Sequence, residues 1–226
     1  MKLDVELLLK KIKKSYDQLY FSRTIIMGAY EINAFGWVLI GFIILIMLRI
    51  YWESDAFNLK CIISDVDGNT YCVRERLKLQ LVADLLAKIT VSMKKLVKHM
   101  GQKYPDRDNV KRLVEKFDPK RVYETLPTSE FTAYSENKGE KLAFCVTKQK
   151  GNNEDLIDEN TLMFVAIHEL AHVANKTVGH DSNFWQNFKF LLVNAKEIGI
   201  YIPEDYKKKQ VNYCGMQISD NPYYDL

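Results

Sequence analysis

The feature that most constrains this chain is an uninterrupted apolar run near its N-terminus. Residues 32–48 carry no charged side chain, and the run continues past a single arginine to complete the segment 32–52. A helix of 21 residues is long enough to cross a hydrocarbon core of about 30 Å. Trp37 lies at one end and Tyr51 and Trp52 at the other, as interfacial aromatic anchors do. We therefore predict one transmembrane helix over residues 32–52.

The 31 residues before this segment form a basic head. Leucines and lysines recur in it at helical spacing, which is typical of an amphipathic helix on a membrane surface. A buried core helix and a cleaved signal peptide are less favoured, because the run has no polar stripe and no small-residue cleavage site follows it. The six basic residues of the head favour a cytoplasmic head and a translocated domain. Four of them lie within residues 10–14, far from the apolar run, so the side of the membrane stays open.

The charge of the chain is unevenly distributed. The whole net charge of +3 belongs to residues 1–52, and residues 53–226 balance to zero. Within that neutral part, residues 74–121 carry 14 basic and six acidic side chains, whereas residues 122–226 have a net charge of −5. This distribution excludes a uniformly basic nucleic-acid coat. The region 74–121 is a candidate surface for an anionic lipid or nucleic acid, and a solvated helix face is the alternative.

Hydrophobic spacing predicts an α+β domain over residues 53–226, with a helical part at 74–121 and a catalytic core at about 122–226. Its helices are expected to surround a small antiparallel sheet. The expected elements are helices over residues 74–100, 110–117, 159–176 and from 181 or 182 to just before 199, and a β-hairpin made of residues 131–135 and 141–147.

All four cysteines follow the apolar run. Cys61 and Cys72 flank the turn sequence DVDGN between two strand-like runs, and a hairpin there would place them opposite each other. A disulfide between them and a pair of buried free thiols are both compatible with the sequence.

Residues 168–172 read HELAH within a predicted helix. His168 and His172 are about one turn apart, so their imidazoles project from the same face, as two ligands of a Zn²⁺ ion do. Glu169 is then placed to accept a proton from a zinc-bound water. His180 is the predicted third ligand, because Gly179 allows the chain to turn back after the helix.

A carboxylate on the next helix is the competing third ligand. Glu197 is the only acidic residue of that helix. In thermolysin-like and aminopeptidase-like enzymes the ligand glutamate falls at positions that correspond here to Leu191 and Leu192. The carboxylate pattern therefore fails, and Asp181 is expected to cap the helix.

The motif HELAH, followed by a short loop and GHDSNFW, resembles the WLM metallopeptidases and the similar SprT-like proteases. The resemblance covers roughly residues 161–192. It implies a minimal zincin-like fold, with the active-site helix against a small sheet, and the roles given above to His168, Glu169, His172 and His180. The CxxC pair of the SprT-like zinc ribbon is absent. Together with the anchor and the tail YCGMQISDNPYYDL, the core is also similar to proteins of large DNA viruses, which implies a virion or host internal membrane.

The expected function is zinc-dependent hydrolysis of a protein or peptide substrate. An extended substrate is expected to pair with an edge strand at residues 141–147, and Tyr201 or Tyr213 to donate a hydrogen bond to the oxyanion. Two other classes remain: a membrane-anchored structural or assembly protein with a zinc site for rigidity, and a protein that binds an anionic ligand through residues 74–121.

Overall fold

The computed structural model describes residue 13 and residues 33–53, 59–126, 129–150 and 155–225. The chain divides into two compact units, residues 1–54 and 55–226. Apart from Lys13, the basic head predicted for residues 1–31 lies outside the described residues.

Helix α2 (Ala34–Glu53) occupies the predicted apolar segment. Its 18 residues from Ala34 to Tyr51 have a mean hydropathy of 2.2, and none of them is buried. Among the described residues this is the one helix long and apolar enough to cross a membrane. A signal sequence near an N-terminus has the same length and composition, so these properties alone do not separate the two.

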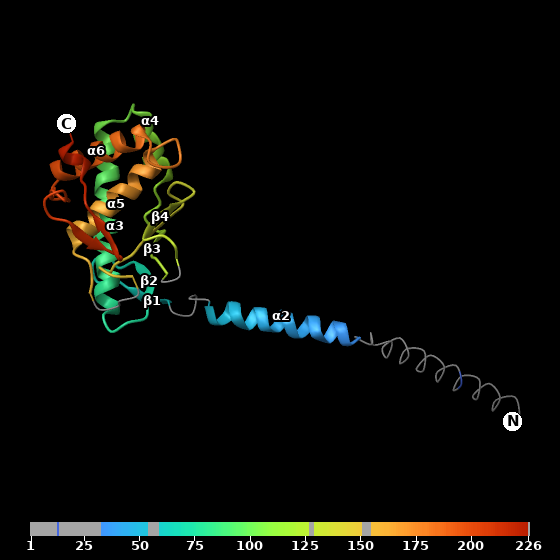
Figure 1. Ribbon diagram of the computed structural model, residues 1–226. Coiled ribbons are helices and arrows are strands. Elements are labelled where there is room, and N and C mark those ends of the chain that lie inside the picture. The colour runs from blue at the N-terminus through green and yellow to red at the C-terminus, as the bar shows by residue number, and fades with distance from the viewer. Residues whose placement is uncertain (1–12, 14–32, 54–58, 127–128, 151–154, 226) are drawn as a thin grey trace, which may run out of the picture. The chain divides into compact units, whose positions relative to one another are not determined.

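The second unit is a mixed α+β fold with small sheets, as the sequence predicts in outline (Figure 1). Four helices surround or cross its core. They are α3 (Leu79–Lys103), α4 (Asp108–Lys116), α5 (Glu159–Ala174) and α6 (Ser182–Glu197). The three-stranded sheet has the order β3 (Val122–Glu124), β5 (Lys141–Phe144), β4 (Ala133–Glu136). Two separate hairpins complete the described strands. One is made of β1 (Leu59–Ile63) and β2 (Thr70–Arg74), the other of β6 (Val211–Tyr213) and β7 (Met216–Ile218). A single 3₁₀ turn, η2 (Pro222–Tyr224), follows.

Helix α5 lies at the centre of this unit. Twelve of its 16 residues are buried, and it packs against α3, α4, α6 and strand β4. Its start is set by Asp158, whose side chain accepts a hydrogen bond of 2.8 Å from the Thr161 amide. The helix that carries the HELAH motif is therefore held by packing on most of its circumference.

Helix α3 begins five residues later than predicted. Arg74 ends strand β2. Leu77 and Leu81, which recur at helical spacing with Leu85 and Ile89 in the predicted helix, are 97% and 58% exposed. Residues spaced by four drift by about 40° at each step, so a stripe that begins at Leu77 cannot remain on one face. The buried face instead begins at Val82 and continues through Leu86.

The three-stranded sheet is mixed rather than antiparallel. Strand β5 lies in its middle, parallel to β3 and antiparallel to β4. The prediction that residues 141–147 form an edge is therefore wrong, and β4 is the edge strand beside α5. Strand β3 has only three residues, which is too short for a side-chain alternation that a sequence pattern could reveal.

Two disulfides and one buried ion cluster join these elements. Cys61 and Cys72 are directly opposite each other in the β1–β2 hairpin and form a disulfide, which decides between the two alternatives above. Cys145 and Cys214 form a second disulfide. The carboxylate of Glu124 on β3 is completely buried between the side chains of Arg74 and Arg76, and it also accepts a hydrogen bond of 2.8 Å from the Arg74 amide.

Candidate functional site

Three histidines converge at one place on the globular unit. His168 and His172 project from α5, and His180 comes from the loop before α6. One potential ligand nitrogen from each lies within 4.8 Å of the other two, and the Nε2 atoms of His168 and His180 are 3.1 Å apart. This is the only such group of potential metal ligands found in the described ranges of the chain.

The electrostatics of His168 and His172 suit metal ligation. Burial, reinforced by the neighbouring His172 and His180, lowers the pKa of His168 to about 3. Burial, with His180 and Lys138 nearby, lowers the pKa of His172 to about 4. Both imidazoles are thus neutral near pH 7, and the neutral form is the one that binds a metal ion.

The ring of Phe184 supports all three imidazoles from α6. Its centroid lies 4.9 Å from that of His168, 4.3 Å from that of His172 and 4.6 Å from that of His180. Phe184 is completely buried, and its amide donates a hydrogen bond of 2.8 Å to Asp181, which caps α6 as predicted. The sequence analysis missed this supporting role, because an apolar residue in an amphipathic helix carries no signal beyond burial.

A small polar network holds the loop that presents His180. Asn175, at the end of α5, donates hydrogen bonds to Thr177 and to Asp181, at 3.1 and 3.2 Å. Thr177 donates to the other carboxylate oxygen of Asp181, and Gly179 adopts a φ of +92°, which an L side chain would strain. The loop is therefore closed on itself, and its conformation directs His180 back towards α5.

Glu169 follows His168 on α5, and both side chains line the same pocket. Burial raises the pKa of its carboxyl to about 8. A bound dication would counter this effect, since a nearby positive charge favours the carboxylate. The pocket has a volume of about 240 Å³. It is lined by Thr132, Ala133, Phe164, Val165, His168, Glu169, Trp185, Phe188, Tyr213, Met216, Ile218, Asp220 and Pro222.

Of the two candidate oxyanion donors, the structure brings one to this pocket. Tyr213 lines it, and burial together with the charge of Glu169 raises the pKa of the Tyr213 hydroxyl. That hydroxyl donates a hydrogen bond of 3.3 Å to the Thr132 carbonyl. Tyr201 lies outside the pocket lining, packs against Phe164, and its hydroxyl accepts a hydrogen bond from Asn221.

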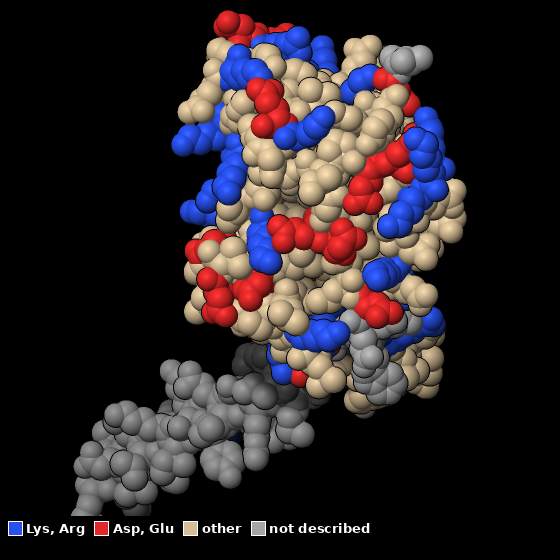
Figure 2. Space-filling view, turned by 90° about the vertical axis from the view of Figure 1, so that its left-hand side faces the viewer, with Lys and Arg blue, Asp and Glu red and all other residues tan. Residues whose placement is uncertain are grey.

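The basic stretch 74–121 is not a single surface. Arg74 and Arg76 are buried on Glu124, so their charges do not reach solvent. Figure 2 shows basic and acidic side chains interspersed over the face that it presents. Lysines gather at one place, where an open hollow of about 630 Å³ lies between α3 and the end of α4. Its lining includes Lys94, Lys95, Lys98, Val114 and Phe117.

The sequence is similar to proteins of large DNA viruses, as expected from its core and tail. An uncharacterised protein of Acanthamoeba polyphaga mimivirus is 27% identical over 173 residues, which is 75% of this chain and 85% of the mimivirus protein. An uncharacterised protein of Invertebrate iridescent virus 6 is 35% identical over 74 residues, and one of Invertebrate iridescent virus 3 is 46% identical over 59 residues. These matches span 40% and 36% of the two iridescent-virus proteins.

No protein-family model matches the sequence, and no solved structure matches it. The similarity to the WLM and SprT-like families therefore stays a prediction from the motif.

Proposed function

We propose that this protein is a membrane-anchored, zinc-dependent metallopeptidase. The observation that carries the proposal is the convergence of His168, His172 and His180 within 4.8 Å, beside a buried glutamate that opens into a pocket. Three histidines are a common protein ligand set for a catalytic Zn²⁺. The active-site helix α5 against a small sheet also supports a zincin-like arrangement. Helix α2 would supply the anchor, in a virion or host internal membrane.

The chain's own residues divide the chemistry between them. His168, His172 and His180 would hold Zn²⁺, which when bound supplies Lewis acidity and lowers the pKa of water. Glu169 accepts a proton from the attacking water and passes it to the leaving amine. Tyr213 is the candidate donor to the oxyanion, for which its hydroxyl has to leave the Thr132 carbonyl.

The edge strand β4 is the proposed docking strand for an extended substrate. Within the described part of the chain it pairs with β5 alone, so its outer backbone groups are available to another strand. Thr132 and Ala133, at the start of β4, also line the pocket that contains Glu169. A peptide added to β4 would therefore extend towards the proposed base.

The decisive experiment uses the full-length chain in lipid nanodiscs, with metal content measured by mass spectrometry and cleavage measured on an unfolded protein. Wild type is expected to hold about one zinc ion and to cleave. Glu169→Gln should keep the zinc and lose about 10²- to 10⁴-fold in rate, the usual contribution of a general base. His172→Ala should lose the zinc.

Glu159→Gln is the matched control. Glu159 lies on the same helix, but it is half-exposed and forms an ion pair of 3.5 Å with Lys88 on α3, away from the pocket lining. This variant should retain both zinc and activity. Wild-type protein without zinc would refute the proposal, as would cleavage by Glu169→Gln at the wild-type rate.

The chief alternative is a zinc site that only stiffens a structural or assembly protein. Such a site needs no carboxyl beside its ligands and no open pocket. Burial raises the pKa of the Glu169 carboxyl to about 8, so the ionised form is costly at this position, and this cost favours a catalytic role over a purely structural one.

A second function is supported by the lysine hollow. Lys94, Lys95 and Lys98 form no ion pair with a described residue, and apolar side chains lie beside them. We propose that this hollow binds an anionic partner, a lipid or a nucleic acid. Replacing all three lysines by glutamine should abolish binding to anionic vesicles or to DNA, and the wild-type affinity should fall steeply with salt.

A further inference from the structure

The pocket beside Glu169 has an apolar interior with its reactive group at one end. Phe164 and Val165 lie about one turn before His168 and Glu169 on α5, so they extend the same face of the helix. Phe188 of α6 lies against them, with its ring centroid 5.1 Å from that of Phe164. At about 240 Å³, the pocket is far larger than the space that one water molecule needs.

The hairpin β6–β7 forms another wall of the pocket. Met216 and Ile218 alternate on β7, so they face the same side of the strand, and both line the pocket. Five links between described residues hold this wall to the neighbouring sheet and the chain after it. Two are backbone hydrogen bonds, from the Cys214 amide to the Thr147 carbonyl at 3.0 Å and from the Gly215 amide to the Lys148 carbonyl at 2.9 Å. The Thr132 hydroxyl contacts the Met216 sulfur at 3.2 Å, the Tyr213 hydroxyl donates to the Thr132 carbonyl, and Cys214 is disulfide-bonded to Cys145.

Among the described residues, only two acidic ones line the pocket, Glu169 and Asp220. Glu169 is at the reactive end. Asp220 is at the rim, where it forms an ion pair of 3.0 Å with Lys207. A charged side chain that entered the interior would lose its hydration without finding a partner, whereas an apolar one would gain the full benefit of leaving water.

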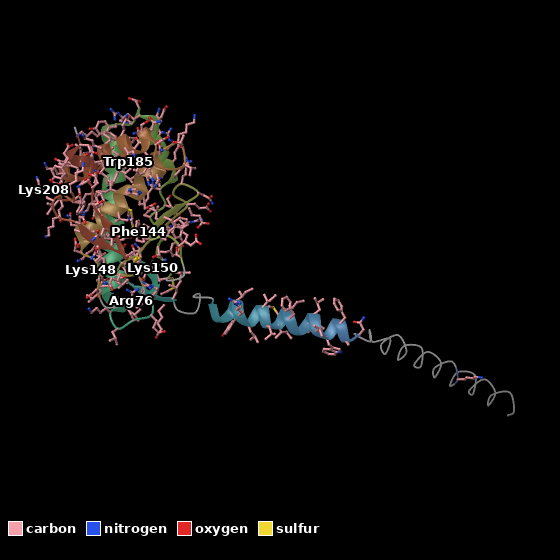
Figure 3. The ribbon with its side chains drawn as sticks, in the orientation of Figure 1. Arg76, Phe144, Lys148, Lys150, Trp185 and Lys208 are labelled. Atoms are coloured by element: carbon pink, nitrogen blue, oxygen red, sulfur yellow. A yellow bond between two sulfur atoms is a disulfide. The ribbon has the colours of Figure 1, made fainter. Side chains whose placement is uncertain are left out.

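We infer that this pocket binds one apolar side chain of the substrate next to the bond that is cleaved, and that Met216 and Ile218 determine its selectivity. The inference rests on the proposed peptidase function and deepens it. Trp185 of α6, labelled in Figure 3, is 46% exposed and also lines the pocket. It provides a flat aromatic rim over which an aliphatic or aromatic side chain can pass.

The test uses the full-length protein in lipid nanodiscs. The zinc content of the protein is measured first. Four zinc-chelating hydroxamates, with glycine, leucine, phenylalanine or aspartate side chains, are titrated by calorimetry, with empty nanodiscs as the blank. The leucine and phenylalanine compounds are expected to bind about tenfold or more tightly than the glycine compound. The aspartate compound is expected to bind no more tightly than glycine.

Two variants test the wall. Met216 is 49% exposed, so Met216→Glu should be tolerated, and it should reduce the leucine-to-glycine affinity ratio about tenfold. Met216→Leu should keep the ratio. Ile202→Glu is the control, since Ile202 is 72% exposed and lies outside the pocket lining.

The outcomes separate the two proposals. If zinc is present but all four compounds bind equally, the pocket inference is overturned and the peptidase function stands. If Met216→Glu keeps the wild-type ratio, the wall does not determine selectivity. If no zinc is present, the proposed function fails and the pocket inference fails with it.

Discussion

The β1–β2 and β6–β7 hairpins both contain disulfide-bonded cysteines, but they are attached to the rest of the globular unit by different interactions. In the β1–β2 hairpin, Cys61 and Cys72 join the two strands of the hairpin itself, and the attachment to the sheet is the buried carboxylate of Glu124. In the β6–β7 hairpin, Cys214 is bonded outside the hairpin, to Cys145 after β5. A disulfide can therefore stiffen one element or position it against another.

The two hairpins also differ in what they contribute to the proposed site. The first hairpin contributes no residue to the pocket beside Glu169, whereas the second contributes Tyr213, Met216 and Ile218. Covalent attachment occurs where a wall of the proposed site has to be positioned, and ionic attachment occurs where only the fold has to be maintained.

The largest expected effect, up to about 5 kcal/mol, comes from breaking the ionic attachment. Glu124→Gln leaves Arg74 and Arg76 buried beside a neutral amide, and loss of one partner of a buried ion cluster costs about 3 to 5 kcal/mol. The free energy of unfolding, measured by denaturant titration of the nanodisc-bound chain, should fall by that amount. Glu136→Gln is the control: it removes an exposed carboxylate that lies 3.9 Å from the Lys141 ammonium group. This change should alter the free energy of unfolding by less than about 1 kcal/mol. Equal losses in the two variants would contradict the structural role of the cluster.

The next effect concerns the covalent attachment. Replacing Cys145 and Cys214 by alanine removes a link between residues 69 positions apart, which costs about 4 kcal/mol in the chain-entropy model. The same change releases one wall of the pocket, so the preference for the leucine over the glycine hydroxamate should also disappear. Stability is measured as above and preference by calorimetry; a stable variant with an unchanged preference would show that the disulfide does not position the wall.

The smallest of the three effects is expected for the disulfide within the first hairpin. Cys61 and Cys72 are only 11 positions apart, and their replacement by alanine should cost about 3 kcal/mol in the same model. The leucine-to-glycine affinity ratio should stay at its wild-type value, because no residue of this hairpin lines the pocket. A changed ratio would mean that the two hairpins are coupled.

The parts of the molecule that the sequence predicts are those with local signals. Helices α5 and α6, with Asp158 and Asp181 as their caps, follow from apolar spacing and capping residues within a few positions of each other. The three histidines lie within 13 consecutive residues, so their convergence needs only a helix and a turn.

The missed parts depend on contacts between distant residues. Strand β3 is too short to show a period, and its parallel pairing with β5 places β5 in the middle of the sheet, with β3 and β4 as the outer strands. Cys145 pairs with Cys214 across 69 positions, and four cysteines alone allow three pairings. That pairing brings Met216 and Ile218 to the pocket. The HELAH motif therefore locates the proposed chemistry, but it does not reveal which residues determine the selectivity for substrate side chains.

The open edge of β4 has a consequence for behaviour at high concentration. Backbone groups that can accept a substrate strand can equally accept a strand of a second copy, which begins self-association. At four residues the edge is short, and it ends at Glu136, whose carboxylate is half-exposed. Charged side chains on an edge strand disfavour its pairing with a further strand. The shortness and charge of β4 therefore limit the growth of aggregates at the strand proposed to receive the substrate.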